Sequence, residues 1–169
     1  IINNLNGFLG ISKLDTFISL IITFIFYVSV INAINRMASI PGYTVVFSIV
    51  FFISMVYVNN FTLNTISIII ISVSLFFIVN NYFNKKKLVL ADSGSLFIGF
   101  WIAFFLIQYI NTSTDSNLIN SFSIKLENIP VISLGLISIP IYDMIRVLFI
   151  RIIKLESPFS ENIVSHFHH

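Results

Sequence analysis

The chain has 169 residues, of which 57% are hydrophobic and only 9% charged, and its formal net charge is +2. A soluble domain of this length would carry about a quarter charged residues. The composition therefore excludes an ordinary soluble domain and indicates an all-α integral membrane protein. The chain contains no cysteine, which excludes disulfides and thiolate metal sites. Because it does not begin with methionine, we expect it to be part of a longer protein.

Five apolar stretches are candidates for crossing a bilayer. They cover residues 16–33, 43–58, 65–79, 96–110 and 130–150. A helix rises about 1.5 Å per residue, and the hydrocarbon core is about 30 Å thick. The sequence therefore predicts a polytopic protein with about five transmembrane helices, in a single membrane domain over residues 1–169. No internal repeat or broken helix is expected, which disfavours a transporter.

Positive charges gather at the helix ends of one predicted side. That side holds Arg36, Lys85, Lys86, Lys87, Arg151 and Lys154, whereas Lys13 and Lys125 lie on the other. Cytoplasmic loops of membrane proteins are enriched in Lys and Arg. We therefore expect cytoplasmic loops at about 35–42, 81–94 and 151–169, with the N-terminus of this chain outside and its C-terminus inside. These loops then share one side and could form one site.

Asp92 stands at the start of the fourth span, directly before Ser93 and shortly after a run of three lysines. The exposed amides at a helix start favour anions. A carboxylate beside lysines suits a divalent cation and a phosphorylated ligand. Alternatively, Asp92 or Ser93 caps the helix, and the lysines only mark the cytoplasmic side.

The last third of the chain carries two more polar groups. Asp143 and Arg146 interrupt the fifth span and lie on one helix face, either as an ion pair or as a substrate-facing acid and base. His166, His168 and His169 at the end could bind a metal, contact phosphate, belong to a purification tag or form a solvated tail.

Four stretches together resemble one family of membrane enzymes. Residues 1–14 (IINNLNGFLGISKL) are similar to the segment before a core helix, and 31–35 (INAIN) to an Asn-Ala-x-Asn opening. Residues 88–100 (LVLADSGSLFIGF) are close to a Met-Gly-Asp-x-Gly-Ser-Leu-x-x-Gly motif, and 140–146 (PIYDMIR) with 157–169 (SPF to HFHH) match a last cytoplasmic loop. In this order they resemble the polyprenyl-phosphate N-acetylhexosamine-1-phosphate transferases, which include the phospho-MurNAc-pentapeptide translocase and the undecaprenyl-phosphate GlcNAc-1-phosphate transferases.

The resemblance implies an enzyme of the bacterial inner membrane, of which this chain would be the C-terminal half. Its expected reaction moves an N-acetylhexosamine-1-phosphate from a UDP-sugar to polyprenyl (undecaprenyl) phosphate and releases UMP, for peptidoglycan, lipopolysaccharide or another cell-envelope polysaccharide. The implied cofactor is Mg²⁺, with Mn²⁺ as an alternative, because two anionic substrates must be neutralised. The expected partners are the UDP-N-acetylsugar, polyprenyl phosphate and the lipid bilayer, with no nucleic acid and with a homodimer left open.

Site residues follow from the same resemblance. Asp92 matches the magnesium-binding acid, and Asn35 matches a polar residue near it, so these two are expected to be catalytic. Residues expected to bind substrate are Lys87, Asn32, Ser93, Arg146, His166, His168 and His169.

The chain departs from the family pattern after Asn35. Ala38 and Pro41 stand where the family usually has aspartates, and Ala91 replaces a glycine. The family's paired aspartates would lie upstream of Ile1. We therefore expect weak magnesium affinity and little turnover by this chain alone. Two alternatives stay open: a degenerate, non-catalytic relative that binds polyprenyl phosphate or a partner glycosyltransferase, and a small membrane transport subunit.

Overall fold

The computed structural model describes residues 1–3, 5–7, 13–38, 40, 42–56, 61–84, 90–111 and 128–153. Its helices are α1 (Thr16–Met37), α2 (Tyr43–Val56), α3 (Phe61–Phe83), α4 (Asp92–Ile110), α6 (Ile129–Leu136) and α7 (Ser138–Ile153). Within these ranges α1, α3 and α4 are long and apolar enough to cross a membrane, and the bent α6–α7 pair could form a fourth span. The prediction of an all-α polytopic membrane protein is confirmed, although α2 has only 14 residues.

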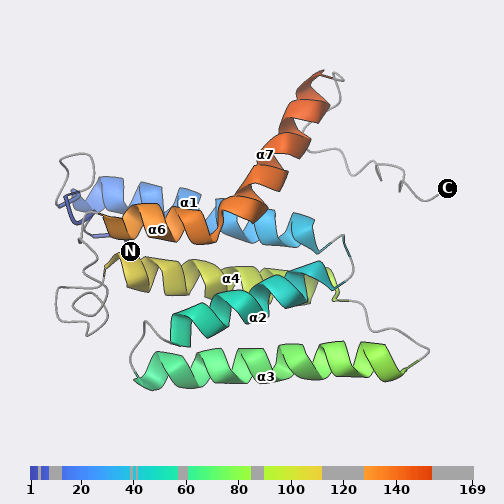
Figure 1. Ribbon diagram of the computed structural model, residues 1–169. Coiled ribbons are helices and arrows are strands. Elements are labelled where there is room, and N and C mark those ends of the chain that lie inside the picture. The colour runs from blue at the N-terminus through green and yellow to red at the C-terminus, as the bar shows by residue number, and fades with distance from the viewer. Residues whose placement is uncertain are drawn as a thin grey trace.

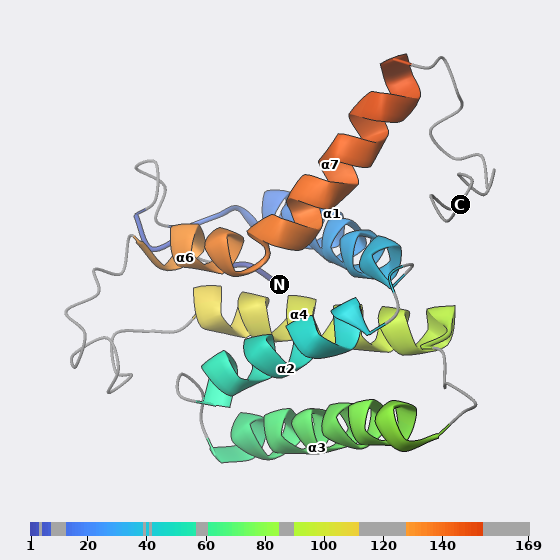
Figure 2. The same cartoon turned by 45° about the vertical axis from the view of Figure 1, so that its right-hand side comes forward.

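The helices form a bundle with α4 at its centre. The two ribbon views place α4 between α1 on one side and the α2–α3 pair on the other (Figure 1; Figure 2). α3 lies at the edge of the bundle, and α7 leans away from the other helices. Since α4 contacts α1, α2 and α6, its residues meet neighbours on several sides.

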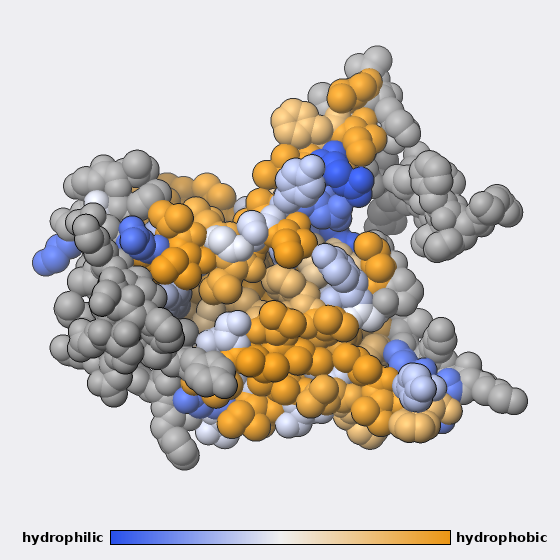
Figure 3. All heavy atoms as spheres, viewed as in Figure 1, coloured by the Kyte–Doolittle hydropathy of each residue, from blue (hydrophilic) through white to orange (hydrophobic). Residues whose placement is uncertain are grey.

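α3 buries two serines among the helices and exposes many of its large apolar side chains. Ser67 and Ser74 are buried, whereas Leu75 and Phe76 are exposed. The Ser74 hydroxyl lies 3.3 Å from the Ser48 hydroxyl of α2. Hydrophobic residues also cover the middle of the face shown in Figure 3. Small polar residues between helices, with apolar residues facing out, suit a helix surrounded by lipid.

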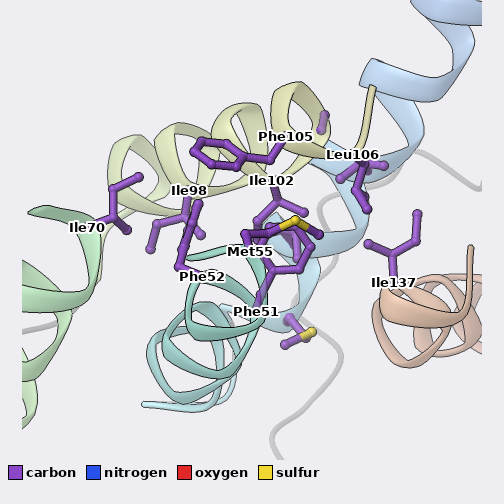
Figure 4. Packing of buried hydrophobic residues seen from close by; sticks show 13 residues of the cluster. Phe51, Phe52, Met55, Ile70, Ile98, Ile102, Phe105, Leu106 and Ile137 are labelled. Atoms are coloured by element: carbon purple, nitrogen blue, oxygen red, sulfur yellow. The ribbon is translucent and has the colours of Figure 1, made fainter. Parts of the chain in front are cut away.

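Aromatic side chains join α2 to α4 in the core (Figure 4). Phe52 of α2 and Phe105 of α4 are both fully buried, and their rings meet edge to face with centroids 5.4 Å apart. Phe51 packs in the same way on Phe52, at 5.2 Å. Edge-to-face pairs of this kind add about 0.5–1.5 kcal/mol each to the area they bury. The Phe52–Phe105 pair holds the short α2 helix on α4.

The N-terminal segment ties the start of α1 to the end of α4. The Ile2 amide donates to Thr23 Oγ1 (2.8 Å), and the Ser19 hydroxyl donates to the Ile2 carbonyl (2.5 Å). The Asn6 side chain donates to the carbonyl of Ile110, the last residue of α4, at 2.8 Å. α1 and α4 therefore run antiparallel, and the end of α1 meets the start of α4.

Small residues let α1 and α4 approach closely. Ser95, Gly99 and Ala103 are buried and repeat every four residues along α4. A Cβ placed on Gly99 would lie 3.1 Å from the Ile31 Cα of α1, which is tighter than nearly all real contacts. Such small-xxx-small stripes bring helix backbones together in membranes.

The predicted continuous span over 130–150 is wrong. α6 and α7 are bent by 63° relative to each other at a break next to Ile137. Pro140 explains the break, because its ring excludes the carbonyl four residues earlier and it has no amide proton to donate. The Ser138 hydroxyl donates to the Gly135 carbonyl at 2.7 Å and satisfies one group freed by the break. The expected lack of a broken helix thus no longer argues against a transport subunit.

Candidate active site

The last turn of α1 and the first turn of α4 are joined by one buried hydroxyl. Ser95 Oγ donates to the Asn35 side-chain oxygen, Oδ1, at 2.5 Å, and it lies 2.9 Å from the Asp92 backbone carbonyl. Ser95 is fully buried, whereas Asn35 is half-buried. The two residues are 60 positions apart in the sequence. The structure therefore brings Asn35 and the start of the Asp92 helix together.

The Asp92 side chain is exposed at the first position of α4. The N-cap residue is Ala91, and no side chain makes a capping hydrogen bond at this helix end. The interpretation that Asp92 or Ser93 caps the helix therefore finds no support. A negative charge in the first turn is still favoured by the helix dipole, by about 0.3–1 kcal/mol. The carboxylate is thus exposed in the first turn of α4.

A cavity of about 450 Å³ lies next to this junction, between α2, α3 and α4. Leu90 and Gly94, on either side of Asp92 in the sequence, line it together with apolar residues such as Val73 and Trp101. An apolar wall does not suit a charged nucleotide sugar. The helix ends that carry Asn35 and Asp92 suit such a ligand better than this cavity does.

Both helix ends fall within a known family. The family model described as glycosyl transferase family 4 matches residues 1–110. The chain belongs to glycosyl transferase family 4. At the level of this family, membership supports transfer of a sugar phosphate to a lipid carrier. No curated protein and no solved structure matches the chain.

The family 4 match covers α1 to α4 and thus both Asn35 and Asp92. It does not extend to α6 and α7. The predicted substrate-binding roles of Arg146 and the histidines therefore stay predictions.

Two other predicted site residues lie near the junction of this family 4 chain. Asn32 is exposed on α1, three residues before Asn35, a spacing that places neighbours on one helix face. Ser93 is exposed in the first turn of α4. Ala38, where the resemblance leads us to expect an aspartate, is the C-cap of α1, and its amide bonds to the carbonyls of Ile34 and Asn35.

Arg146 belongs to a separate pair. Its Nη2 donates to Asp143 Oδ1 at 3.0 Å within α7, so the predicted ion pair forms. The Arg146 side chain is 57% exposed. Among the described residues, no hydrogen bond or ion pair links it to Asn35 or Asp92.

Lys87, His166, His168 and His169 lie outside the described residues. Across the part of the chain that the structure does describe, no group of three or more His, Cys, Asp or Glu could hold a metal ion. Of the predicted magnesium site, the structure thus describes the acid Asp92 and the nearby polar residue Asn35.

Sequence reasoning did not single out Ser95 as a functional residue. The available signal was the four-residue spacing of Ser95, Gly99 and Ala103, which marks the face of α4 that contacts another helix.

Proposed function

We propose that this family 4 member transfers an N-acetylhexosamine-1-phosphate from a UDP-sugar to polyprenyl phosphate and releases UMP. The observation that carries the proposal is the junction of α1 and α4, where the Ser95 hydroxyl links the Asn35 side chain to the backbone of Asp92, whose side chain is exposed. These two helix ends hold the motifs that resemble the transferases. A carboxylate and a carboxamide at the exposed start of a helix suit phosphates and a cation.

In the proposed reaction, an oxygen of the lipid phosphate attacks the phosphorus that carries the sugar. The bond from that phosphorus to the bridging oxygen breaks, and UMP leaves with the electron pair. The Asp92 carboxylate fits Mg²⁺, or Mn²⁺, because Mg²⁺ commonly takes one or two carboxylates and completes its shell with waters and substrate phosphates. A bound cation would neutralise the charge that accumulates on the phosphate oxygens.

In this mechanism the residues of the chain bind and orient. Asp92 would hold the cation, and Asn35 offers a neutral polar contact to the substrate. The amides in the first turn of α4, around Ser93, present their positive dipole end to the phosphates. Lys87, Arg146 and the three terminal histidines are proposed to add positive charge for the nucleotide.

We further propose that the protein lies in the inner membrane with this junction on the cytoplasmic side. UDP-sugars are made in the cytoplasm, and the lysine-rich side should face inward.

The Asp92→Asn variant tests the proposal. In membranes containing the complete protein, we expect UMP release from a UDP-N-acetylsugar and polyprenyl phosphate to fall at least about 100-fold, because the charge that binds the cation is lost. Release would be measured at matched protein levels.

Asp15→Asn is the matched control. Asp15 is an exposed carboxylate at the N-cap of α1, and it also makes no side-chain capping bond. Its variant should release UMP at the wild-type rate. Undiminished release by Asp92→Asn would contradict the proposal, and a wild-type protein that binds polyprenyl phosphate without turnover would favour the non-catalytic relative.

A further inference from the structure

The hydroxyl of Ser95 lies within hydrogen-bond distance of two carbonyl oxygens, but it has one proton to donate. Its distance to Asn35 Oδ1 is 2.5 Å and its distance to the Asp92 carbonyl is 2.9 Å. In the bond to Asn35, the Ser95 hydroxyl is the donor and the carboxamide oxygen of Asn35 is the acceptor.

This bond fixes which way the Asn35 carboxamide faces. The group is planar, with an oxygen at one end and an NH₂ group at the other, so a partner on the oxygen turns the NH₂ group away. Among the described residues, the NH₂ group of Asn35 has no hydrogen-bond partner. It is thus the end of the side chain that a ligand can use.

Ser95 itself cannot reach a ligand. It is fully buried, and one turn further along α4 the backbone at Gly99 packs directly on α1. The hydroxyl therefore stays between the two helices. Since its bond from one helix to the other is to Asn35, we expect its influence on a reaction to pass through Asn35.

We propose that Ser95 is a positioning residue, which holds Asn35 by its oxygen so that the Asn35 NH₂ group donates to an anionic phosphate oxygen of the nucleotide sugar. The inference rests on the proposed function. An N–H donor suits a phosphate oxygen, and hydrogen bonds to charged acceptors are stronger than neutral ones.

A double-mutant cycle on ligand binding tests the coupling. The dissociation constant of UDP-N-acetylglucosamine would be measured by calorimetry, with Mg²⁺ present, for the complete purified protein, Ser95→Ala, Asn35→Ala and the double variant. Each single change should weaken binding about threefold to tenfold, the range for one lost hydrogen bond. The double variant should bind no more weakly than Asn35→Ala, because Ser95 acts through Asn35.

If the losses of binding in Ser95→Ala and Asn35→Ala add up in the double variant, the positioning role is overturned. Additive losses are what a general structural defect at Ser95 would give, because such a defect does not depend on Asn35. Ser133→Ala is the matched control. Ser133 is also fully buried, but its hydroxyl bonds at 2.9 Å to Ile129 of its own helix. That variant should bind the nucleotide sugar like the wild type.

The Asn35→Asp variant tests whether Asn35 acts as a hydrogen-bond donor or only fills space. Asn35 is half-buried near the end of α1, so the substitution should not prevent folding. A carboxylate of the same shape cannot donate, and it repels phosphate. Binding should therefore weaken at least as much as in Asn35→Ala, and wild-type affinity would overturn the donor assignment. A wild-type protein that does not bind UDP-N-acetylglucosamine would defeat the proposed function and this inference together. Wild-type binding with an additive cycle would defeat the inference alone.

Discussion

Three side chains at the junction of α1 and α4 make up the candidate site. Asp92 supplies an exposed charge, Asn35 a half-buried carboxamide, and Ser95 the buried hydroxyl that connects them. Because their environments differ, a substitution at each of them should affect a different binding step. Loss of Asp92 should affect the cation, loss of Asn35 the nucleotide, and loss of Ser95 the nucleotide through Asn35.

Ala38 offers a gain-of-function test at the same scale. It is the C-cap of α1, three residues after Asn35, and it stands where the resemblance leads us to expect an acid. We expect Ala38→Asp to raise Mn²⁺ or Mg²⁺ affinity about threefold to tenfold, since a second carboxylate joins the site but opposes the dipole at the helix C-terminus. Metal titration monitored by thermal unfolding would measure the affinity.

The neutral variant Ala38→Asn serves as the control for this change, because it has nearly the same shape without the charge. Equal metal affinities for the Asp and Asn variants would mean that the loop after α1 no longer lies where a family aspartate would act.

The α1–α4 pair is the element on which the junction depends. Its two ends are fixed differently: the N-terminal segment bonds to both helices at one end, and Ser95 bonds to Asn35 at the other. Between them, the backbone contact at Gly99 sets the distance. The hydrogen bond at the site therefore requires close packing one turn away.

Gly99→Leu should disrupt this element. Because a Cβ at Gly99 already meets the Ile31 backbone, the larger side chain must push α1 away from α4. We expect a destabilisation of about 1–3 kcal/mol, the usual cost of overpacking. The measurement is the apparent unfolding temperature of the protein in detergent.

Gly135→Leu provides the comparison, because nothing lies within 4 Å of a Cβ placed on Gly135 of α6. It should unfold at nearly the wild-type temperature. Equal effects of the two substitutions would show that the loss does not arise from the contact between α1 and α4.

For the whole molecule, the orientation in the membrane can be tested directly. The start of α4 and the end of α1 lie together, and the N-terminal segment lies at the opposite ends of these two helices. In the proposed orientation, the apolar surface of the bundle faces lipid and the polar junction faces the cytoplasm.

Cysteine labelling can check this orientation, since the chain has no cysteine of its own. Ser93→Cys and Ile40→Cys, both at exposed positions, should react with a membrane-impermeant maleimide only after the cytoplasmic side is opened. Asn3→Cys should react from the outside of intact cells. Labelling of Ser93→Cys and Asn3→Cys from the same side would contradict the proposed topology.

The sequence by itself determined the class of protein and the position of the helices. Long apolar runs such as 16–33 and 96–110 specify membrane helices locally, because an unbonded backbone is too costly in lipid. The sequence also pointed to Asn35 and Asp92, since short motifs keep their spacing along the chain. The ion pair of Asp143 and Arg146 was equally predictable, as it depends on a three-residue spacing.

Only the tertiary structure decided which groups meet. The bond from Ser95 to Asn35 joins residues 60 positions apart, and its partner depends on how closely two helices pack. The break at Ile137 was missed because an apolar run looks the same whether its helix is straight or bent, although Pro140 was a local warning. Hydrophobicity places a helix in the membrane, but contacts between helices decide its partner and its bend.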